Sequence, residues 1–228
     1  MIATAGIGVI FDCDGTLLDS MEMWHSLDDR IAEEAGVVFT KEDKDFLTAG
    51  TLRECADYMH EKHGIGCSGA DVERMINDET AKWYATEAVP RPGAAAFVRG
   101  LHAAGVPMAV ASSTPPQNLR AGLETAGLAQ YMSAIVSVED AGAPKREPLV
   151  YDMARQVLGT PRCRTWGFED ARYAIETLSR AGYRTVGVFD TDVAGTREEL
   201  AAAADVFIAS FTEMTAEEFL AVAYAHQD

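Results

Sequence analysis

The stretch Ile7-Gly8-Val9-Ile10-Phe11-Asp12-Cys13-Asp14-Gly15-Thr16 joins a short apolar run to two aspartates. The run at residues 7–11 predicts a buried β-strand, because it is short, apolar and followed by turn-forming residues. It is also far too short to cross a membrane. Asp and Gly after a strand often form only a turn, so this stretch alone leaves a turn and a catalytic site about equally open.

Five similar apolar runs follow and complete the set of predicted strands, at residues 107–111, 134–138, 165–168, 185–189 and 206–209. Helical segments of the usual crossover length lie between these five runs. Strands that alternate with helices form parallel sheets with helices on both faces. We therefore expect a Rossmann-like, doubly wound α/β core. The stretch at 212–225, with Phe219 and Leu220 among acidic residues, predicts an amphipathic helix that covers the sheet.

Residues 19–88 carry no strand pattern and predict a small α-helical cap, inserted after the first strand into a core of residues 1–18 and 89–228. Three pairs have capping-box spacing, and three glycines stand where helices should end. These residues are Thr40 with Asp43, Thr51 with Glu54, Ser68 with Asp71, and Gly36, Gly50 and Gly64. Two apolar helix faces can then form the centre of the cap, one from Leu52, Cys55 and Met59 and one from Val72, Ile76 and Trp83.

The charge of the chain limits its partners. Asp and Glu number 36 against 19 Lys and Arg, a formal net charge of −17, and no basic cluster is present. Nucleic acid and anionic membranes would be repelled, so an anionic small molecule must be attracted by a local cation. The four cysteines form no C-x-x-C pair and the first residues lack the positive charge of a secretory signal, which predicts reduced thiols and a cytoplasmic protein. Nothing in the sequence indicates the oligomeric state.

Polar residues follow three of the later strands. Ser112-Ser113-Thr114 precedes a helix, where Thr114 and Gln117 have capping-box spacing and Pro115 suits the first helical position. Such a helix N-terminus binds anions, although each feature alone could be an ordinary cap. Lys145 follows the third strand, and Glu169-Asp170 follows the fourth, ahead of a helix predicted at 171–181.

In a doubly wound sheet these strand ends meet at one edge, where ligands bind. Carboxylates about 4 Å apart repel by about 4 kcal/mol per pair at an effective dielectric near 20, so the cluster must take up protons or a cation. All-oxygen ligands favour Mg²⁺. A zinc site at His60, His63 and Cys67 is the weaker alternative, because a fourth ligand is missing and Gly64 interrupts the helix.

Asp12-x-Asp14-Gly15-Thr16, Ser112, Lys145 and Glu169-Asp170 together resemble the four motifs of the haloacid dehalogenase superfamily. The similarity covers the whole chain, since the insert resembles the small mobile cap of that superfamily, and the local sequences are similar to its phosphatase and beta-phosphoglucomutase-like branch. One departure concerns the third motif. That branch usually has Lys-Pro-x-Pro, whereas this chain has Lys145-Arg146-Glu147-Pro148.

The resemblance implies that Asp12 is a nucleophile that forms an aspartyl-phosphate and that Asp14 is the general acid and base. It further implies a Mg²⁺ held by the Asp12 side chain, the Asp14 carbonyl and Asp170, with Glu169 as a ligand or neighbour. Ser112 and Lys145 would bind the phosphoryl oxygens, and Thr16 and Ser113 are further candidates for phosphate binding. The expected reaction is hydrolysis of a small, sugar-like phosphomonoester. Asp14 argues against dehalogenation, because that branch lacks this carboxylate.

Two other functions stay open at this point. A mutase of the same branch typically has a histidine at the start of the cap, where this chain has Trp24 with His25 one residue later, and the offset favours hydrolysis. A phosphate-responsive binding protein without turnover is the alternative of another class. In the cap, Arg53 is the candidate to bind the distal part of the substrate, or else an exposed residue that pairs with Glu54 or Asp57.

Overall fold

The computed structural model describes residues 6–191 and 194–226. Six parallel strands form one sheet in the order β3-β2-β1-β4-β5-β6. They are β1 (Gly8–Phe11), β2 (Met108–Ser112), β3 (Ala134–Ser137), β4 (Thr165–Glu169), β5 (Arg184–Val188) and β6 (Val206–Ile208). The predicted strands are all present, and the expected doubly wound α/β class is confirmed. No helix in the described ranges is long and apolar enough to cross a membrane.

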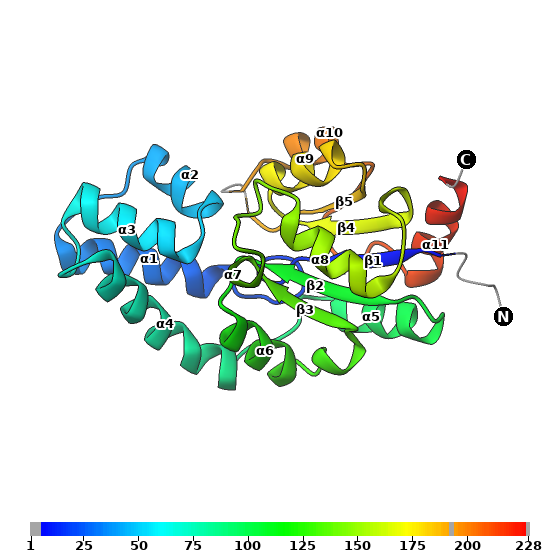
Figure 1. Ribbon diagram of the computed structural model, residues 1–228, viewed down its shortest axis with the longest axis horizontal. Helices are drawn as coiled ribbons and strands as arrows, with labels where there is room; N and C mark the ends of the chain where they lie inside the picture. The colour runs from blue at the N-terminus through cyan, green and yellow to red at the C-terminus, as the bar shows by residue number, and fades with distance from the viewer. Residues whose placement is uncertain (1–5, 192–193, 227–228) are drawn as a thin grey trace.

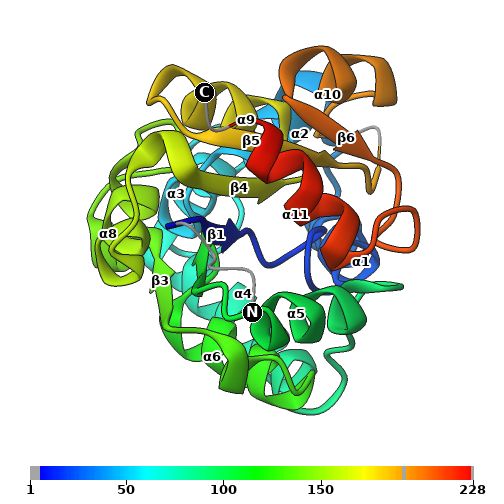
Figure 2. The same cartoon turned by 90° about the vertical axis from the view of Figure 1, so that its right-hand side faces the viewer.

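Helices cover both faces of the sheet, as Figure 2 shows, with α5 and α11 on one side of β1 and α8 on the other. The alternation of side chains along β1 explains this, because Val9 and Phe11 point to one face and Ile10 to the other. The first face packs against α5 (Ala94–Ala103), α6 (Pro116–Thr125) and α11 (Ala216–Ala225). The second face packs against α8 (Leu149–Leu158) and α9 (Arg172–Arg180).

Shorter helices connect the remaining elements: α7 (Val138–Ala141), α10 (Arg197–Ala203), and the 3-10 turns η1 (Ala129–Tyr131) and η2 (Arg162–Arg164). The C-terminal helix α11 begins after a capping box of Thr215 and Glu218, and its Phe219 is fully buried on the sheet. The predicted covering helix is therefore confirmed. Its first turn starts a few residues later than the predicted stretch.

Four helices form the cap, which lies beside the core in Figure 1. They are α1 (Met21–Ala35), α2 (Lys41–Ala49), α3 (Leu52–His63) and α4 (Gly69–Thr86). They enclose a separate apolar cluster that includes Met59, Val72 and Ile76. Trp83 was expected in this cluster, but it packs against the main core instead, because it lies near the end of α4 where that helix reaches α6.

The cap helices begin largely as the sequence predicts. Thr40 and Thr51 each form a complete capping box, while the Ser68 hydroxyl accepts from the Asp71 amide. Gly36 and Gly64 end their helices in the left-handed conformation, whereas Gly50 ends α2 in an extended one. Gly50 therefore leads straight from α2 into the turn before α3, and this turn faces the core.

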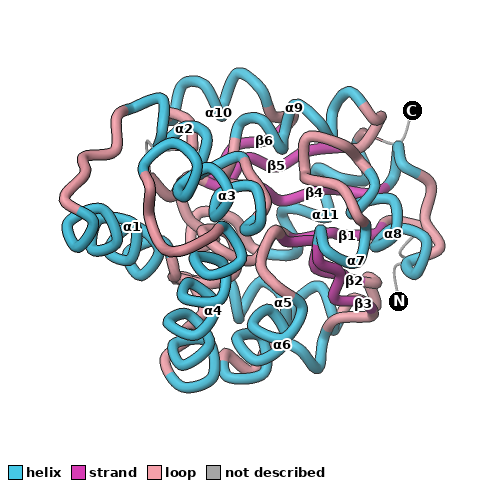
Figure 3. The backbone as a smooth tube through the Cα atoms, turned by 60° about the vertical axis from the view of Figure 1, so that its left-hand side comes forward, coloured by secondary structure: helices cyan, strands magenta, loops and turns pink. Residues whose placement is uncertain are grey.

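The two linkers between core and cap, at residues 17–20 and 88–91, lie side by side. The Asp19 amide donates to the Val89 carbonyl at 3.0 Å, and the Arg91 amide donates to the Leu17 carbonyl at 2.9 Å. These bonds lie where the sequence places the limits of the insert. In Figure 3 the cap helices stand in front of the strand ends, so the cap covers the edge at which β1 ends.

Candidate active site

Asp12 and Asp14 follow the carboxyl end of β1 and lie between sheet and cap. The Asp12 amide donates to the Phe168 carbonyl of the neighbouring strand at 2.9 Å, which fixes the residue at the sheet edge. Gly15 turns the chain with φ of 77°. A Cβ atom at Gly15 would clash with the Asp170 carboxylate, so only glycine allows this close approach.

Lys145 lies between two of the carboxylates. Its buried ammonium donates to Asp12 Oδ1 and to Glu169 Oε1, the latter at 2.7 Å. The Tyr151 hydroxyl donates to the same Glu169 oxygen at 2.7 Å. Burial alone would lower the pKa of Lys145, but the charges of Asp12 and Glu169 outweigh it and raise that pKa. The lysine is therefore a permanent cation at this site.

One ammonium does not balance the acidic residues beside it. One oxygen each from Asp12, Glu169 and Asp170 lies within 4.8 Å of the others. Burial raises the pKa of all three carboxyls. The charge of Asp12 adds to the effect at Glu169 and Asp170, and the charge of Asp14 adds to it at Asp12. Glu169 Oε2 is also buried with no hydrogen-bond partner. This all-oxygen set, with an unpaired buried oxygen, fits a hard divalent cation such as Mg²⁺.

Asp14 lies outside that carboxylate cluster, and hydroxyl groups surround it. Ser20 Oγ and Tyr84 Oη donate to its Oδ1 at 2.6 and 2.7 Å, and Thr114 Oγ1 donates to its Oδ2 at 2.5 Å. Its carboxylate is thus positioned by residues of the core, of the linker from core to cap, and of the cap helix α4. The metal contact implied for Asp14 was through its carbonyl and remains a prediction.

The residues after β2 reach the same site, with one correction. Ser112, Ser113 and Thr114 all line the pocket, and the Ser112 hydroxyl accepts from the Thr114 amide at 3.1 Å. Thr114 does not cap the following helix, because its hydroxyl binds Asp14. Helix α6 begins one residue later than predicted, at Pro116.

A pocket of about 170 Å³ connects these residues to the cap. Asp12, Asp14, Lys145, Glu169 and Asp170 line its core end. Its cap end is formed mainly by apolar side chains, namely Met21, Trp24, Leu47, Leu52, Cys55, Met59 and Ile76. The pocket is therefore strongly polar at one end and apolar at the other.

Two predicted site residues do not reach this pocket. Thr16 is fully buried, its hydroxyl has no hydrogen-bond partner, and it does not line the pocket. Arg53 is exposed and pairs with Asp57 at 2.9 Å and with Glu73 at 3.0 Å. The interpretation of Arg53 as an exposed, ion-paired helix residue therefore fits the structure, because the acidic side chains on α3 and α4 hold its guanidinium outside the pocket.

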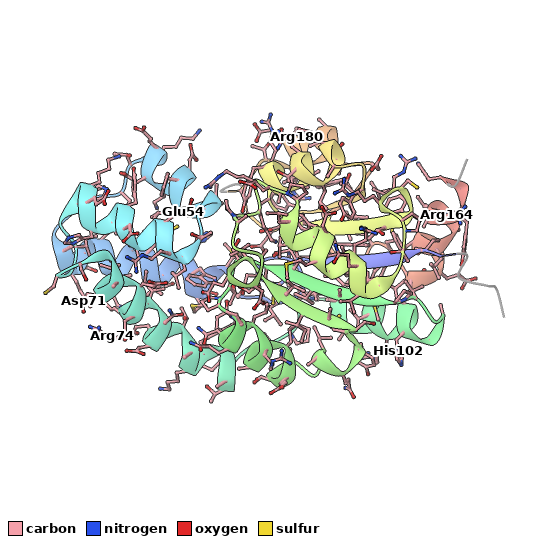
Figure 4. The ribbon with its side chains drawn as sticks, in the orientation of Figure 1. Glu54, Asp71, Arg74, His102, Arg164 and Arg180 are labelled. Atoms are coloured by element: carbon pink, nitrogen blue, oxygen red, sulfur yellow. The ribbon has the colours of Figure 1, made fainter. Side chains whose placement is uncertain are left out.

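Sequence reasoning missed the residues that join cap to core. Arg146 Nη1 donates to the Ala49 carbonyl at 2.5 Å, and Nη2 donates to Glu54 at 3.0 Å. Glu54 lies on the cap where it faces the core (Figure 4). The Tyr173 hydroxyl also donates to the Thr48 carbonyl, at 3.4 Å. Arg146 could have been singled out from the sequence, because it stands in the third motif where the beta-phosphoglucomutase-like branch usually has proline.

The considered zinc site is not formed. His63 Nε2 lies 3.0 Å from the buried carboxylate of Asp43, and His60 Nδ1 lies 2.9 Å from the Ile65 carbonyl. Both histidines are thus used in packing the end of α3. Cys67 is one of four free cysteines, as expected for reduced thiols.

Comparison with known proteins places this geometry in a family. Residues 9–188 match the model of haloacid dehalogenase-like hydrolases. The validoxylamine A 7'-phosphate phosphatase of Streptomyces hygroscopicus subsp. limoneus is 29% identical over 210 residues, which cover 90% of this chain and 94% of that protein. A phosphorylated carbohydrates phosphatase of Thermotoga maritima is 22% identical over 178 residues, which cover 78% and 82%.

Solved structures show the same fold. CbbY from Rhodobacter sphaeroides, in complex with xylulose-(1,5)bisphosphate, superimposes with a TM-score of 0.76 at 24% identity over 90% of this chain and 95% of that one. A beta-phosphoglucomutase from Clostridium difficile gives a TM-score of 0.79 at 18% identity over 96% of each chain. With the family match spanning most of the sequence, the chain belongs to the haloacid dehalogenase-like hydrolases.

Proposed function

We propose that this chain is a Mg²⁺-dependent phosphatase that hydrolyses a small, sugar-like phosphomonoester through an aspartyl-phosphate on Asp12. The observation that carries the proposal is the buried group of Asp12, Lys145, Glu169 and Asp170, with Asp14 two residues after Asp12 in a pocket that the cap covers. The phosphatases among its relatives support the same reaction class.

The residues have distinct roles in the proposed reaction. Asp12 Oδ1 is held by Lys145, and the Asp12 carboxylate is the group that attacks phosphorus. Asp14 then gives a proton to the leaving alcohol oxygen as its bond to phosphorus breaks. In the second step Asp14 takes a proton from a water molecule that attacks the aspartyl-phosphate, which releases phosphate and restores Asp12.

The phosphoryl group needs positive charge and hydrogen-bond donors. Lys145 supplies the first, and the hydroxyls of Ser112 and Ser113 line the place where the phosphoryl oxygens would lie. Asp12, Asp170 and Glu169 would hold the Mg²⁺, which supplies further positive charge to the phosphoryl oxygens. A pocket of about 170 Å³ under a helical cap favours small metabolites over phosphoproteins.

Trp24 stands at the position where mutases of this branch typically have a histidine. Its Nε1 donates to the Tyr84 hydroxyl at 3.1 Å. An indole cannot transfer a proton as an imidazole does, and this favours hydrolysis over phosphoryl transfer between sugars. A mutase would convert a sugar phosphate to its isomer with little release of phosphate. A binding protein would retain the phosphate and release none.

The purified protein should release phosphate from p-nitrophenyl phosphate and from members of a panel of sugar phosphates when Mg²⁺ is present. We expect the release to stop in EDTA and to return when Mg²⁺ is restored. Undiminished release in EDTA would refute the metal requirement. Tight phosphate binding without any turnover would favour the binding protein.

A further inference from the structure

The cap end of the pocket is mainly apolar, and among the described residues that line it Asp28 is the one carboxylate. Asp28 lies on α1, one turn after Trp24, and lines the pocket together with Leu52 and Cys55. It is close enough to Cys55 that the two groups interact electrostatically. The described carboxylates at the core end belong to the proposed catalytic group, but Asp28 has no place in that mechanism.

Asp28 is half-buried and lacks a partner. It makes no hydrogen bond or ion pair with any residue that the structure describes. Burial raises its pKa to about 7, the charge of Asp29 adds to the effect, and Lys44 opposes it. The neighbouring Asp29, by contrast, is exposed and lies 3.4 Å from Lys44. A carboxylate that is half-buried in a mainly apolar wall loses water without gaining a partner, which is unfavourable, so its presence at this wall points to a ligand that completes it.

The arginines near the cap end that could bind an anionic group of a ligand are already paired with other residues. Arg53 is paired with Asp57 and Glu73 outside the pocket, and Arg146 is held by Glu54 and the Ala49 carbonyl. Within the described part of the chain, the pocket walls include Lys145, which is bound to carboxylates at the core end, and His25. The cap end thus combines apolar surface with an acidic group.

We propose that Asp28 sets the specificity of the enzyme, by binding hydroxyl or ammonium donors on the distal end of the leaving group and by repelling a second phosphate or a carboxylate there. The inference rests on the proposed phosphatase function and narrows it to phosphate esters of neutral or amine-bearing polyols. A mainly apolar wall that carries a carboxylate acceptor suits a sugar-like ligand, which has a carbon face and hydroxyl groups at its edge.

Two matched pairs of substrates test this inference. Sorbitol 6-phosphate and 6-phosphogluconate differ only at the carbon farthest from the phosphate, which carries an alcohol in one and a carboxylate in the other. Glucose 6-phosphate and glucosamine 6-phosphate differ by a hydroxyl against an ammonium group. The ratio of kcat/KM within each pair cancels effects that are common to both substrates.

Near pH 8, the wild-type enzyme should favour sorbitol 6-phosphate over 6-phosphogluconate by at least about tenfold, which corresponds to about 1.4 kcal/mol. It should also favour glucosamine 6-phosphate over glucose 6-phosphate. In Asp28→Asn both ratios should fall to within about threefold of unity. Asp29→Asn removes the same charge one residue later on the exposed side of α1, and it should keep the wild-type ratios.

A thermal measurement accompanies the kinetics. An aspartate whose pKa is raised by folding destabilises the native state above the pKa of the unfolded chain, and this loss is complete above pH 7. Asp28→Asn should therefore melt at a higher temperature than wild type near pH 8, and Asp29→Asn should not. A lower melting temperature for Asp28→Asn would mean that the carboxylate has a structural partner, which would overturn the inference.

The inference and the proposed function can fail separately. If p-nitrophenyl phosphate is hydrolysed but none of the four sugar phosphates is, each is tested as its competitive inhibitor, and the same ratios are expected in the inhibition constants. Wild-type ratios that persist in Asp28→Asn, or a wild-type preference for 6-phosphogluconate, would overturn the role of Asp28. Absence of phosphate release from every ester would instead refute the proposed function.

Discussion

Replacing Lys145 by methionine removes the ammonium between Asp12 and Glu169 while most of the side-chain volume is kept. The lysine side chain is only 4% exposed, and its partners Asp12 and Glu169 are 8% and 1% exposed. Removing one partner of a buried ion pair costs about 3–5 kcal/mol, because the remaining charge is left uncompensated. We expect Lys145→Met to lose about this much unfolding free energy near pH 8 without divalent metal.

The loss of unfolding free energy in Lys145→Met should be smaller at acid pH. In the unfolded chain a glutamate has a pKa of about 4.3, so neutralising it near pH 5.5 costs only about 1.6 kcal/mol. The pKa values of Asp12 and Glu169 are already raised in the native protein and should rise further without Lys145, so these groups take up protons on folding. The variant therefore recovers stability as pH falls, and its loss near pH 5.5 should be about 1.5–2 kcal/mol.

Urea unfolding in EDTA at the two pH values, followed by far-UV circular dichroism, measures both quantities. Lys82→Met is the matched control, because Lys82 is exposed on α4 and its ammonium forms no described ion pair. The control should change little at either pH. A loss below about 1 kcal/mol near pH 8, or an equal loss at both pH values, would contradict the view that Lys145 neutralises a buried carboxylate cluster.

Four shorter predictions concern activity. Asp12→Asn should lose at least about 10³-fold in kcat with the fold intact, since an amide cannot accept the phosphoryl group; activity within about tenfold of wild type would end the nucleophile assignment. Asp14→Asn should also be severely impaired, and mass spectrometry should detect slow phosphorylation of Asp12. Asp170→Ala should raise the Mg²⁺ concentration for half-maximal activity or abolish turnover, which a metal titration would measure. Arg53→Ala should leave kcat and KM within about twofold for every substrate, and a substrate-dependent rise in KM would restore Arg53 as a specificity residue.

The strands and their catalytic ends could be predicted because both depend on local sequence. A short apolar run that is buried on both faces stands out against amphipathic helices, and parallel strands must bring their carboxyl ends to one edge. Asp12, Ser112, Lys145 and Glu169 therefore meet as expected, although they are far apart in the chain. The capping boxes at Thr40 and Thr51 are equally local, and they form as predicted.

The remaining features depend on tertiary contacts that local spacing does not encode. Thr114 has the spacing of a helix cap, yet its hydroxyl binds Asp14, which is a hundred residues earlier in the chain. The sequence left two alternatives open for Arg53, and local spacing could not decide between them. In the structure Leu52 lines the pocket, and Arg53 pairs with Asp57 outside it. Asp28 gave no signal at all, because an aspartate on an acidic amphipathic helix is ordinarily exposed.

The hydroxyl groups around Asp14 connect the proposed acid and base to the position of the cap. Ser20 belongs to the linker from core to cap and Thr114 to the core, whereas Tyr84 reaches Asp14 from the cap helix α4. The Tyr84 ring is fully buried in the main core cluster, where the end of α4 packs against α6. The Tyr84 hydroxyl therefore joins the last turns of the cap to Asp14.

Tyr84→Phe tests this connection, because it removes the hydroxyl and keeps the buried ring. A hydrogen bond to a charged acceptor contributes about 1.5–3 kcal/mol, and two other donors remain on Asp14, so we expect kcat to fall about tenfold with little change in KM. Tyr58→Phe is the control, because the Tyr58 hydroxyl donates to Asp43 at 2.7 Å within the cap. Steady-state kinetics with p-nitrophenyl phosphate should separate the two variants. An equal fall in both would mean that loss of packing order in the cap, rather than the bond to Asp14, limits the reaction.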